Sequence, residues 1–355
     1  MFAQTLKRFV IAGVAVAALS ACSGQPGAAG GTAVSGAGAS FPAPLYTKWA
    51  SAFNQAGLGK INYQSIGSGG GIKQIKSSTV DFGATDKPLK LADLDAAGLL
   101  QFPAVIGGVV PVVNLSGIKS GEVHLTGKIL GEIFLGKIKA WNAPEIAALN
   151  AGVKLPATPI TVVHRSDGSG TSFLFTTYLT GADPEWAKAV GASDSVNWPT
   201  GLGGKGNDGV AAFVKQTAGS IGYVEYAFAK QNSLTTMLLQ NKAGKFPEPT
   251  AAAFSAAGAS APWTTAPGNA VLLLDQPGEG SWPISAVTFI LVHKAPANPE
   301  KVAAALKFFD WAFKNGDEMA AKLDFVPLPE AVKTMVRSQW SQVQAGGKPV
   351  YTPAK

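Results

Sequence analysis

Short apolar runs that alternate with helical periods limit the folds open to this chain of 355 residues. Such runs have the length and the β-branched or aromatic content of short strands. They lie at residues 61–66, 80–84, 160–163 and 288–292. Because helical patterns lie between them, the sequence predicts βαβ units, parallel-type sheets and an α/β fold.

Two of these helices are predicted from apolar residues spaced three or four apart, which is typical of a helix face that packs on a core. The second has Asn298 as its expected N-cap, Pro299 at its first position and Gly316 just past its end. The apolar stripes consist of Leu45, Trp49 and Phe53, and of Val302, Leu306, Phe309 and Phe313. The alanine-rich segment 250–262 is instead predicted to be a solvent-facing helix or loop.

The composition excludes several classes of protein. Hydrophobic residues make up 46% of the chain and charged residues 14%, which argues against a disordered or coiled-coil protein. The only Cys excludes a disulfide framework, and the separated His124, His164 and His293 lack metal-ligand spacing. We therefore predict no metal site and no cofactor, and the length favours two domains.

Residues 1–22 have the pattern of an export signal. Lys7 and Arg8 precede an apolar run over 9–19 that is too short to span a bilayer. The run ends at a Leu-Ser-Ala-Cys sequence that resembles a bacterial lipobox, which would place a lipid on Cys22. The alternative is an ordinary signal peptide cut near Ala18 or Ala21. Either reading predicts export, and residues 23–34 are predicted to be a flexible tether.

The net charge gives no indication of a nucleic-acid partner. Removal of the export signal takes away Lys7 and Arg8 and lowers the formal charge from +7 to +5. The remaining basic residues are scattered, and no nucleic-acid motif accompanies them. A solvated, mildly basic surface is the better interpretation.

Three glycine- and serine-rich loops lead into predicted helices, and they occupy residues 36–42, 67–71 and 165–172. A helix N-terminus has unpaired N–H groups, and glycine lets an anion approach them. One such loop is more often an ordinary helix cap, but three indicate an anion site if the fold brings them together. The third also contains Arg165, whose guanidinium suits an oxyanion.

Asp86, which follows the buried run 80–84, permits two readings. A carboxylate beside an anion is favourable if the anion keeps a proton, as phosphate does near neutral pH and sulfate does not. Alternatively, Asp86 caps the next helix through the Lys87-Pro88 turn.

Enzyme motifs fail on inspection. The segment 201–206 matches G-x-G-x-x-G but lacks a convincing βαβ context, so we interpret it as a glycine loop. Asp167 replaces the glycine that a G-x-S-x-G motif requires before Ser169. His164 and Asp167 lie near Ser169 in sequence, which does not establish a catalytic relay.

Long motifs in this chain resemble the periplasmic phosphate-binding proteins of bacterial phosphate ABC transporters, and the likeness extends from about residue 35 to residue 348. The motifs are GAGASFPAPLYTKW (36–49), IGSGGGIKQI (66–75), VDFGATDKPL (80–89), LGKIKAWN (135–142), HRSDGSGTSFLFTTYL (164–179), GLGGKGNDGVAAFV (201–214), GSIGYVEYA (219–227) and KFFDWAF (307–313).

The resemblance implies the type II periplasmic-binding-protein fold, in which two α/β lobes are joined by hinge strands that cross twice and the ligand lies between them. It places residues 35–107 and 286–355 in one lobe and residues 112–281 in the other. The hinges are expected near 108–111 and 282–285.

The same resemblance implies a phosphate site, residue by residue. Asp86 is expected to accept the phosphate proton, Arg165 to bind the anion, and Asp167 to orient Arg165 from behind. The other expected contacts are hydroxyl and backbone amide groups of Ser40, Phe41, Ser68, Ser169, Gly170 and Thr171.

We therefore expect a monomeric, non-enzymatic protein of the periplasm or cell envelope that closes around phosphate. Its implied partners are the membrane permease subunits of an ABC transporter with a cytoplasmic ATPase, and the membrane itself if Cys22 is lipidated. A receptor for another protonated oxyanion, such as arsenate, and a phosphatase remain the alternatives.

Overall fold

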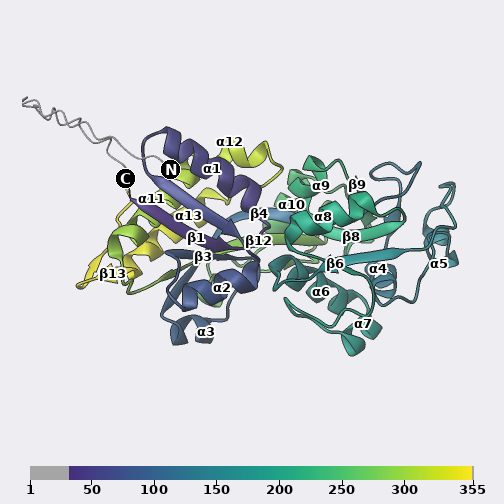
Figure 1. Ribbon diagram of the computed structural model, residues 1–355, viewed down its shortest axis with the longest axis horizontal. Helices are drawn as coiled ribbons and strands as arrows, with labels where there is room; N and C mark the ends of the chain where they lie inside the picture. The colour runs from purple at the N-terminus through teal and green to yellow at the C-terminus, as the bar shows by residue number, and fades with distance from the viewer. Residues whose placement is uncertain (1–31, 354–355) are drawn as a thin grey trace, which may run out of the picture. The chain divides into compact units, whose positions relative to one another are not determined.

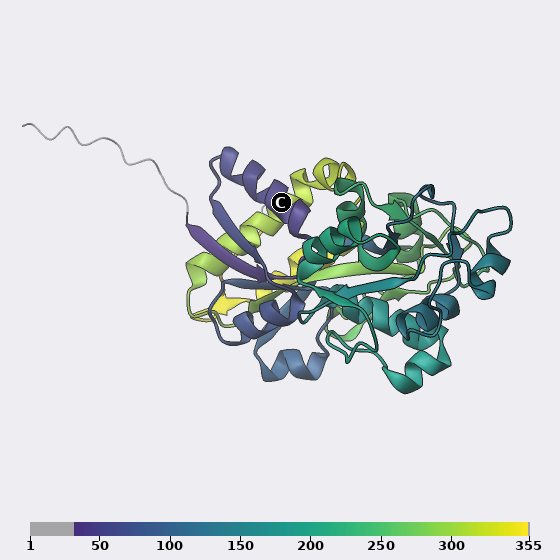
Figure 2. The same cartoon turned by 45° about the vertical axis from the view of Figure 1, so that its right-hand side comes forward.

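A computed structural model describes residues 32–353, and Figures 1 and 2 show the arrangement of its elements. The longer strands are β1 (Ala33–Gly38), β2 (Lys60–Ser65), β3 (Phe82–Thr85), β4 (Leu99–Val113), β6 (Thr161–Arg165), β7 (Leu202–Gly204), β8 (Ser220–Glu225) and β12 (Ile284–His293). Short strands are β5 (His124–Leu125), β9 (Thr235–Thr236), β10 (Leu238–Leu239), β11 (Leu273–Leu274), β13 (Gln344–Ala345) and β14 (Lys348–Pro349).

The longer strands form one main sheet, and helices cover both of its faces. They are α1 (Ala43–Gln55), α2 (Ser68–Lys76), α3 (Leu91–Ala96), α4 (Gly127–Phe134), α5 (Pro144–Leu149), α6 (Gly170–Ala182), α7 (Pro184–Ala189), α8 (Gly206–Gln216), α9 (Tyr226–Gln231), α10 (Ala251–Gly258), α11 (Pro299–Asn315), α12 (Asp317–Ala321) and α13 (Glu330–Gln339). Two 3₁₀ turns, η1 (Pro267–Asn269) and η2 (Trp340–Gln342), complete the set.

The main sheet has the strand order β2-β1-β3-β12-β4-β8-β6-β7. Its outer parts are parallel, as the alternating pattern predicts: β1 pairs with β2 and β3, and β6 pairs with β7 and β8. In the middle, β12 runs antiparallel to both β3 and β4. The sheet is therefore mixed, because a strand from late in the chain is inserted between two early ones.

Strand β4 belongs to both halves of the sheet. Residues 99–108 pair with β12, and residues 109–113 pair with β8. All 15 residues of β4 are buried. In Figure 1, β4 and β12 cross the middle of the sheet, with α1, α2 and α11 at one end and α6, α7 and α8 at the other.

The two apolar stripes form the expected helices. Helix α1 buries Leu45, Trp49 and Phe53. The side chain of Asn298 caps α11 by accepting from the Lys301 N–H at 3.2 Å. Gly316 is needed for close packing, since a Cβ there would lie 2.4 Å from Trp49 Nε1. The predicted stripes are thus core faces.

The prediction for segment 250–262 is wrong in part. Residues 251–258 form α10, with the Thr250 side chain as its cap, but one face of the helix is buried rather than solvated. Phe254 is fully buried and its ring occupies the space that a Cβ at Gly108 would need. The helix therefore packs against the point where β4 changes partners.

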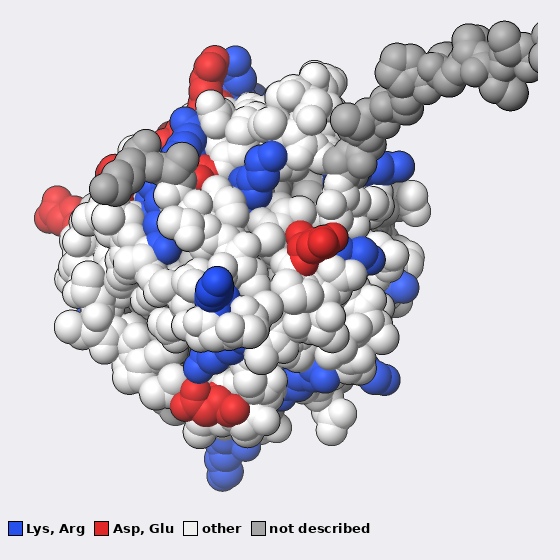
Figure 3. Space-filling view, turned by 90° about the vertical axis from the view of Figure 1, so that its left-hand side faces the viewer, with Lys and Arg blue, Asp and Glu red and all other residues white. Residues whose placement is uncertain are grey.

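The predicted signal segment 1–22, including Cys22, lies outside the described residues. Strand β1 already begins at Ala33, so residues 33 and 34 belong to the sheet rather than to the predicted tether. Among residues 32–353, no helix is long and apolar enough to cross a membrane. On the face in Figure 3, basic and acidic side chains are interspersed, consistent with a scattered basic surplus.

Candidate functional site

The predicted loops lie at the carboxyl ends of strands, where each leads into a helix. Ser40 lies between β1 and α1, Ser68 begins α2 after β2, and Ser169 is the N-cap of α6 after β6. Ser169 Oγ accepts from the Ser172 N–H at 3.0 Å. This bond uses a lone pair of the hydroxyl and leaves its proton available for another acceptor.

The loops meet through glycine backbones. The Gly69 N–H donates to the Gly168 carbonyl at 2.9 Å. A Cβ at Gly170 would lie 2.5 Å from Ser68 Oγ and 2.6 Å from the Asp86 Cβ. Any side chain at residue 170 would therefore hold α6 away from α2. Loops from distant parts of the sequence thus converge, as the anion-site prediction requires.

Asp86 lies directly after β3 and is 1% exposed. The Asp86 N–H donates to Ser68 Oγ at 3.1 Å, and Ser68 Oγ lies 3.4 Å from Asp86 Oδ2. The helix-cap alternative is wrong, because α3 begins only at Leu91, with Lys90 as a cap residue that makes no side-chain bond.

The environment of Asp86 disfavours its charge. Burial raises the pKa of this carboxyl to about 7, although the Thr288 hydroxyl, the Arg165 charge and the Ser68 hydroxyl act in the opposite direction. A pKa in this range allows the carboxyl to exchange a proton with a ligand near neutral pH.

Arg165 ends β6 and is held by Asp167. Its Nε and Nη2 donate to the two carboxylate oxygens of Asp167 at 2.8 and 2.7 Å. Asp167 also accepts from the Gly206 N–H at 3.1 Å. Although burial opposes its charge, the bonds and charge of Arg165 hold the pKa of Asp167 below its ordinary value. The structure therefore pairs Asp167 with Arg165, at the position where the family resemblance predicts an orienting acid.

Several buried polar atoms at this site have no hydrogen-bond partner among the described residues, including Asp86 Oδ1, Arg165 Nη1 and, beside Asp86, Thr288 Oγ1. Asp86 Oδ1 is an acceptor and Arg165 Nη1 is a donor. Buried polar atoms are usually paired, and leaving one unpaired costs about 1–3 kcal/mol. A ligand that both donates and accepts hydrogen bonds would satisfy both atoms.

Comparison with known proteins decides the family. A family model for the PBP superfamily domain matches residues 23–315. The chain is 56% identical to Phosphate-binding protein PstS of Pasteurella multocida, over 86% of this chain and 89% of that protein. It is 54% identical to PstS of Haemophilus influenzae, over 86% of this chain and 92% of that protein. The chain belongs to the PstS family of phosphate-binding proteins. The family predicted from the motifs is confirmed.

Solved structures confirm the predicted fold class. A high-affinity periplasmic phosphate-binding protein (PfluDING) bound with phosphate has a TM-score of 0.73 and 22% identity, over 90% of this chain and 98% of that one. A phosphate-binding protein from Stenotrophomonas maltophilia has a TM-score of 0.68 and 24% identity, over 87% of this chain and 94% of that one. This chain therefore has the periplasmic-binding-protein fold.

The remaining predicted residues of this PstS family member lie in the same place. Thr171 is in the first turn of α6 and is buried. Phe41 is fully buried, and its ring packs edge-on against Phe325 at 6.0 Å. Because that ring lies in the core, only the backbone of Phe41 is available to a ligand.

Asn207 is a residue that sequence reasoning missed. It lies in the first turn of α8, directly after the 201–206 glycine loop, and is fully buried. Its side-chain amide donates to Ser40 Oγ at 2.9 Å and to Thr171 Oγ1 at 3.2 Å. The segment 201–206 does not form a nucleotide-binding motif. It contains the short strand β7, which leads into α8 just as the other strands lead through their loops into helices.

A second missed contact lies at the rim of the site. Lys87 Nζ and Asp194 Oδ1 form an ion pair at 2.9 Å, with side chains 36% and 21% exposed. The carbonyl of Asp194 also accepts from the Ser169 N–H at 2.9 Å. The ion pair therefore joins the turn after β3 to the residue that caps α6.

The catalytic alternative gains no geometric support. His164 Nδ1 lies 3.0 Å from the Arg165 carbonyl, and its ring stacks on Trp198 at 4.8 Å. Asp167 is occupied by Arg165 rather than by the imidazole. Within residues 32–353, no cluster of His, Cys, Asp and Glu could hold a metal ion.

Proposed function

We propose that this chain binds inorganic phosphate in the cell envelope and delivers it to the permease of an ABC transporter. The observation that carries the proposal is Asp86, a buried acceptor with an unpartnered oxygen, set among hydroxyl groups, helix N-termini and Arg165. Phosphate near neutral pH keeps a proton to donate while its other oxygens accept. The names of the PstS relatives and of the phosphate-bound structure support the same ligand.

Each predicted residue has a role that its placement supports. Asp86 accepts the phosphate proton, and Arg165 donates through its free Nη1. The hydroxyl and backbone amide donors are provided by Ser40, Phe41, Ser68, Ser169, Gly170 and Thr171. Phe41 contributes through its backbone N–H alone.

The proposed mechanism is closure of two lobes around the anion, with residues 35–107 and 286–355 in one lobe and 112–281 in the other. The exchange of β4 partners between Gly108 and Val109 supports a hinge at 108–111. The start of β12 at Ile284 supports the second hinge, at 282–285. Phosphate stabilises the closed form because only that form presents all donors together.

The proposed location is the periplasm, reached through the signal over residues 1–22. Delivery requires only that the permease subunits recognise the closed monomer, so no catalytic step is proposed. Lipidation at Cys22 would add a membrane anchor. Mass spectrometry of the protein extracted from cells tests this, because an unmodified N-terminus at another residue would exclude the anchor.

The deciding experiment is calorimetric titration of residues 23–355 after unfolding and refolding to remove carried-over anion. Phosphate, arsenate and sulfate are titrated separately across pH 5 to 8.5. We expect saturable one-to-one phosphate binding, and weak sulfate binding at the upper end of the range. A folded protein that binds neither phosphate nor arsenate would contradict the proposal and favour the phosphatase alternative.

A further inference from the structure

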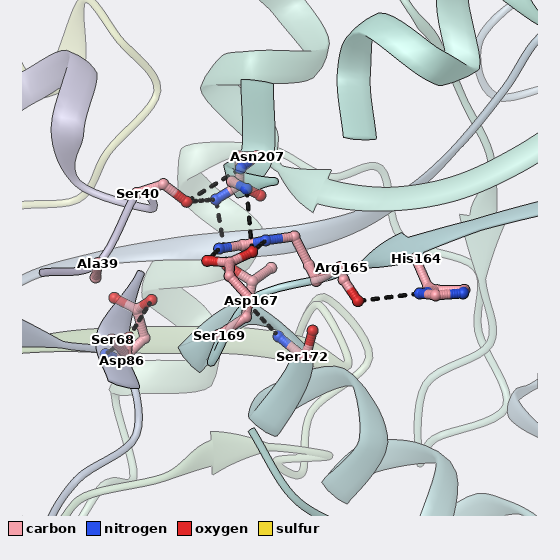
Figure 4. A network of polar contacts seen from close by, with 12 residues as sticks. Ala39, Ser40, Ser68, Asp86, His164, Arg165, Asp167, Ser169, Ser172 and Asn207 are labelled. Carbon is pink, nitrogen blue, oxygen red and sulfur yellow. Dashed lines mark hydrogen bonds and ion pairs between the residues drawn. The ribbon is translucent and has the colours of Figure 1, made fainter. Parts of the chain in front are cut away.

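Asn207 uses its backbone N–H and both ends of its side-chain amide within the site. Its backbone N–H and its side-chain Nδ2 both donate to Ser40 Oγ, at 3.1 and 2.9 Å. Nδ2 also donates to Thr171 Oγ1 at 3.2 Å, and Oδ1 accepts from the Glu225 N–H at 3.0 Å. Figure 4 shows Asn207 beside Ser40, above the Arg165–Asp167 pair.

These partners fix the orientation of the Asn207 amide. The Glu225 N–H can only donate, so the amide atom that faces it is the oxygen. The NH₂ group must then face the hydroxyls of Ser40 and Thr171. Both of its hydrogens are used, and no rotation of the amide gives an equivalent set of bonds.

The consequence concerns the hydroxyl proton of Ser40. A serine hydroxyl has one proton and two acceptor lone pairs. Asn207 fills both lone pairs of Ser40 Oγ, so the hydroxyl can form a further bond only by donating. Thr171 Oγ1 has one lone pair filled by Asn207, whereas Ser40 Oγ has both. A hydroxyl whose only remaining bond is a donated one suits an anion and cannot bind a cation or another donor.

We propose that Asn207 is a positioning residue that turns the hydroxyl of Ser40 into a committed donor toward the bound anion and holds the hydroxyl of Thr171 by one donated bond. Ser40 comes from the β1–α1 loop and Asn207 from α8, on opposite sides of the proposed hinge. Ser40 therefore accepts these two hydrogen bonds only when the lobes close, and closure is coupled to the affinity for the anion. This inference rests on the proposed phosphate function.

The test compares phosphate affinity of the wild type, Asn207→Asp and Asn207→Ala in stripped protein. A carboxylate only accepts, so Asn207→Asp draws the hydroxyl protons away from the anion and adds a repelling charge. We expect an affinity loss of at least about 100-fold at pH 8. Asn207→Ala removes the two side-chain donors without reversing them, and we expect a loss of about 10-fold.

A pH profile separates positioning from a structural defect. Protonation of the introduced carboxyl restores a donor, so the loss for Asn207→Asp relative to wild type should shrink from pH 8 to pH 5. The loss for Asn207→Ala should not change. Other charged groups face this site, namely Asp86, Asp167, Glu225 and Arg165. They are present in every variant, so their effect cancels in the ratio of variant to wild-type affinity.

A matched background completes the test. In Ser40→Ala, Thr171→Val protein, Asn207→Ala should cost less than about twofold, because it has no hydroxyl left to orient. The inference would be overturned if Asn207→Asp bound phosphate with wild-type affinity or if its affinity loss did not depend on pH. It would also be overturned if Asn207→Ala lost as much affinity in this background as in the wild type. If thermal unfolding shows that Asn207→Asp does not fold, Asn207→Ala in the two backgrounds decides. Failure of the wild type to bind phosphate would instead reject the proposed function.

Discussion

At the scale of single residues, burial sets the behaviour of Asp86, whose pKa is raised to about 7. Phosphate loses its second proton in the same pH range, so the carboxyl and its ligand titrate as one coupled pair. As the pH falls below 7, the carboxyl of the ligand-free protein gains a proton of its own. A protonated carboxyl can donate to an oxyanion that has no proton.

This argument predicts how sulfate rejection depends on pH. Sulfate binding should be weakest near pH 8 and should strengthen as the pH falls through about 7. Asp86→Asn mimics the protonated carboxyl, so it should bind sulfate at pH 8 and lose the pH dependence. Competition of sulfate against phosphate across pH 5 to 8.5 measures both effects, and unchanged sulfate rejection in Asp86→Asn would contradict the proton-acceptor role.

The same carboxyl should make the ligand-free protein less stable at higher pH. Its folded pKa of about 7 lies above the ordinary aspartate value of 3.8, so the folded state binds more protons than the unfolded state between these values. The free energy of unfolding should therefore fall as the pH rises through that window. Thermal unfolding should show a weaker pH dependence in Asp86→Asn, whereas substitution of the exposed Asp93 by Asn should leave the dependence intact.

Arg165 offers a direct test of anion contact. Arg165→Ala should weaken phosphate binding by roughly 2–5 kcal/mol, the usual loss for one member of a buried charged pair. Arg165→Lys keeps the charge but not the two-pronged bond to Asp167, so we expect a smaller loss. A calorimetric loss under about 0.5 kcal/mol for Arg165→Ala would exclude the contact.

At the scale of elements, the approach of α6 to α2 depends on Gly170. Gly170→Ala should weaken phosphate binding by at least about 10-fold, because its methyl group overlaps Ser68 and Asp86 only when the helices meet. The ligand-free protein should unfold at a similar temperature. Gly181→Ala on the same helix meets nothing within 4 Å, and it should leave binding unchanged. Equal affinities in both variants would contradict the close approach.

Sequence reasoning succeeds for elements whose signals are local. Helix α11 follows from its apolar stripe, its Asn298 cap and Pro299, and the loops before α1, α2 and α6 follow from their glycines. The burial of α10 could not be predicted, because it depends on a glycine far away in sequence: Phe254 fits only where Gly108 has no side chain. Asn207 escaped notice for the same reason, since its partner Ser40 lies 167 residues away.

At the scale of the whole molecule, the Lys87–Asp194 pair joins the two proposed lobes at their rim. Both side chains are partly exposed, so the pair should contribute no more than about 1 kcal/mol to closure. Lys87→Gln should weaken phosphate binding up to about fivefold at low salt, and the difference should vanish at high salt. Lys294→Gln breaks a pair with Asp95 inside one proposed lobe and should not alter binding. A salt-independent loss in Lys87→Gln would exclude the ion-pair mechanism.

The position of β12 has a consequence for how the chain folds. This strand lies between β3 and β4, yet the 170 residues 114–283 separate it from β4 along the chain. Strands β1 to β4 cannot form their native sheet until residue 293 has been synthesised, because their central member is missing. Contacts between such distant segments form slowly. A nascent chain therefore stays incompletely folded through most of its synthesis, a condition that suits the proposed export across a membrane.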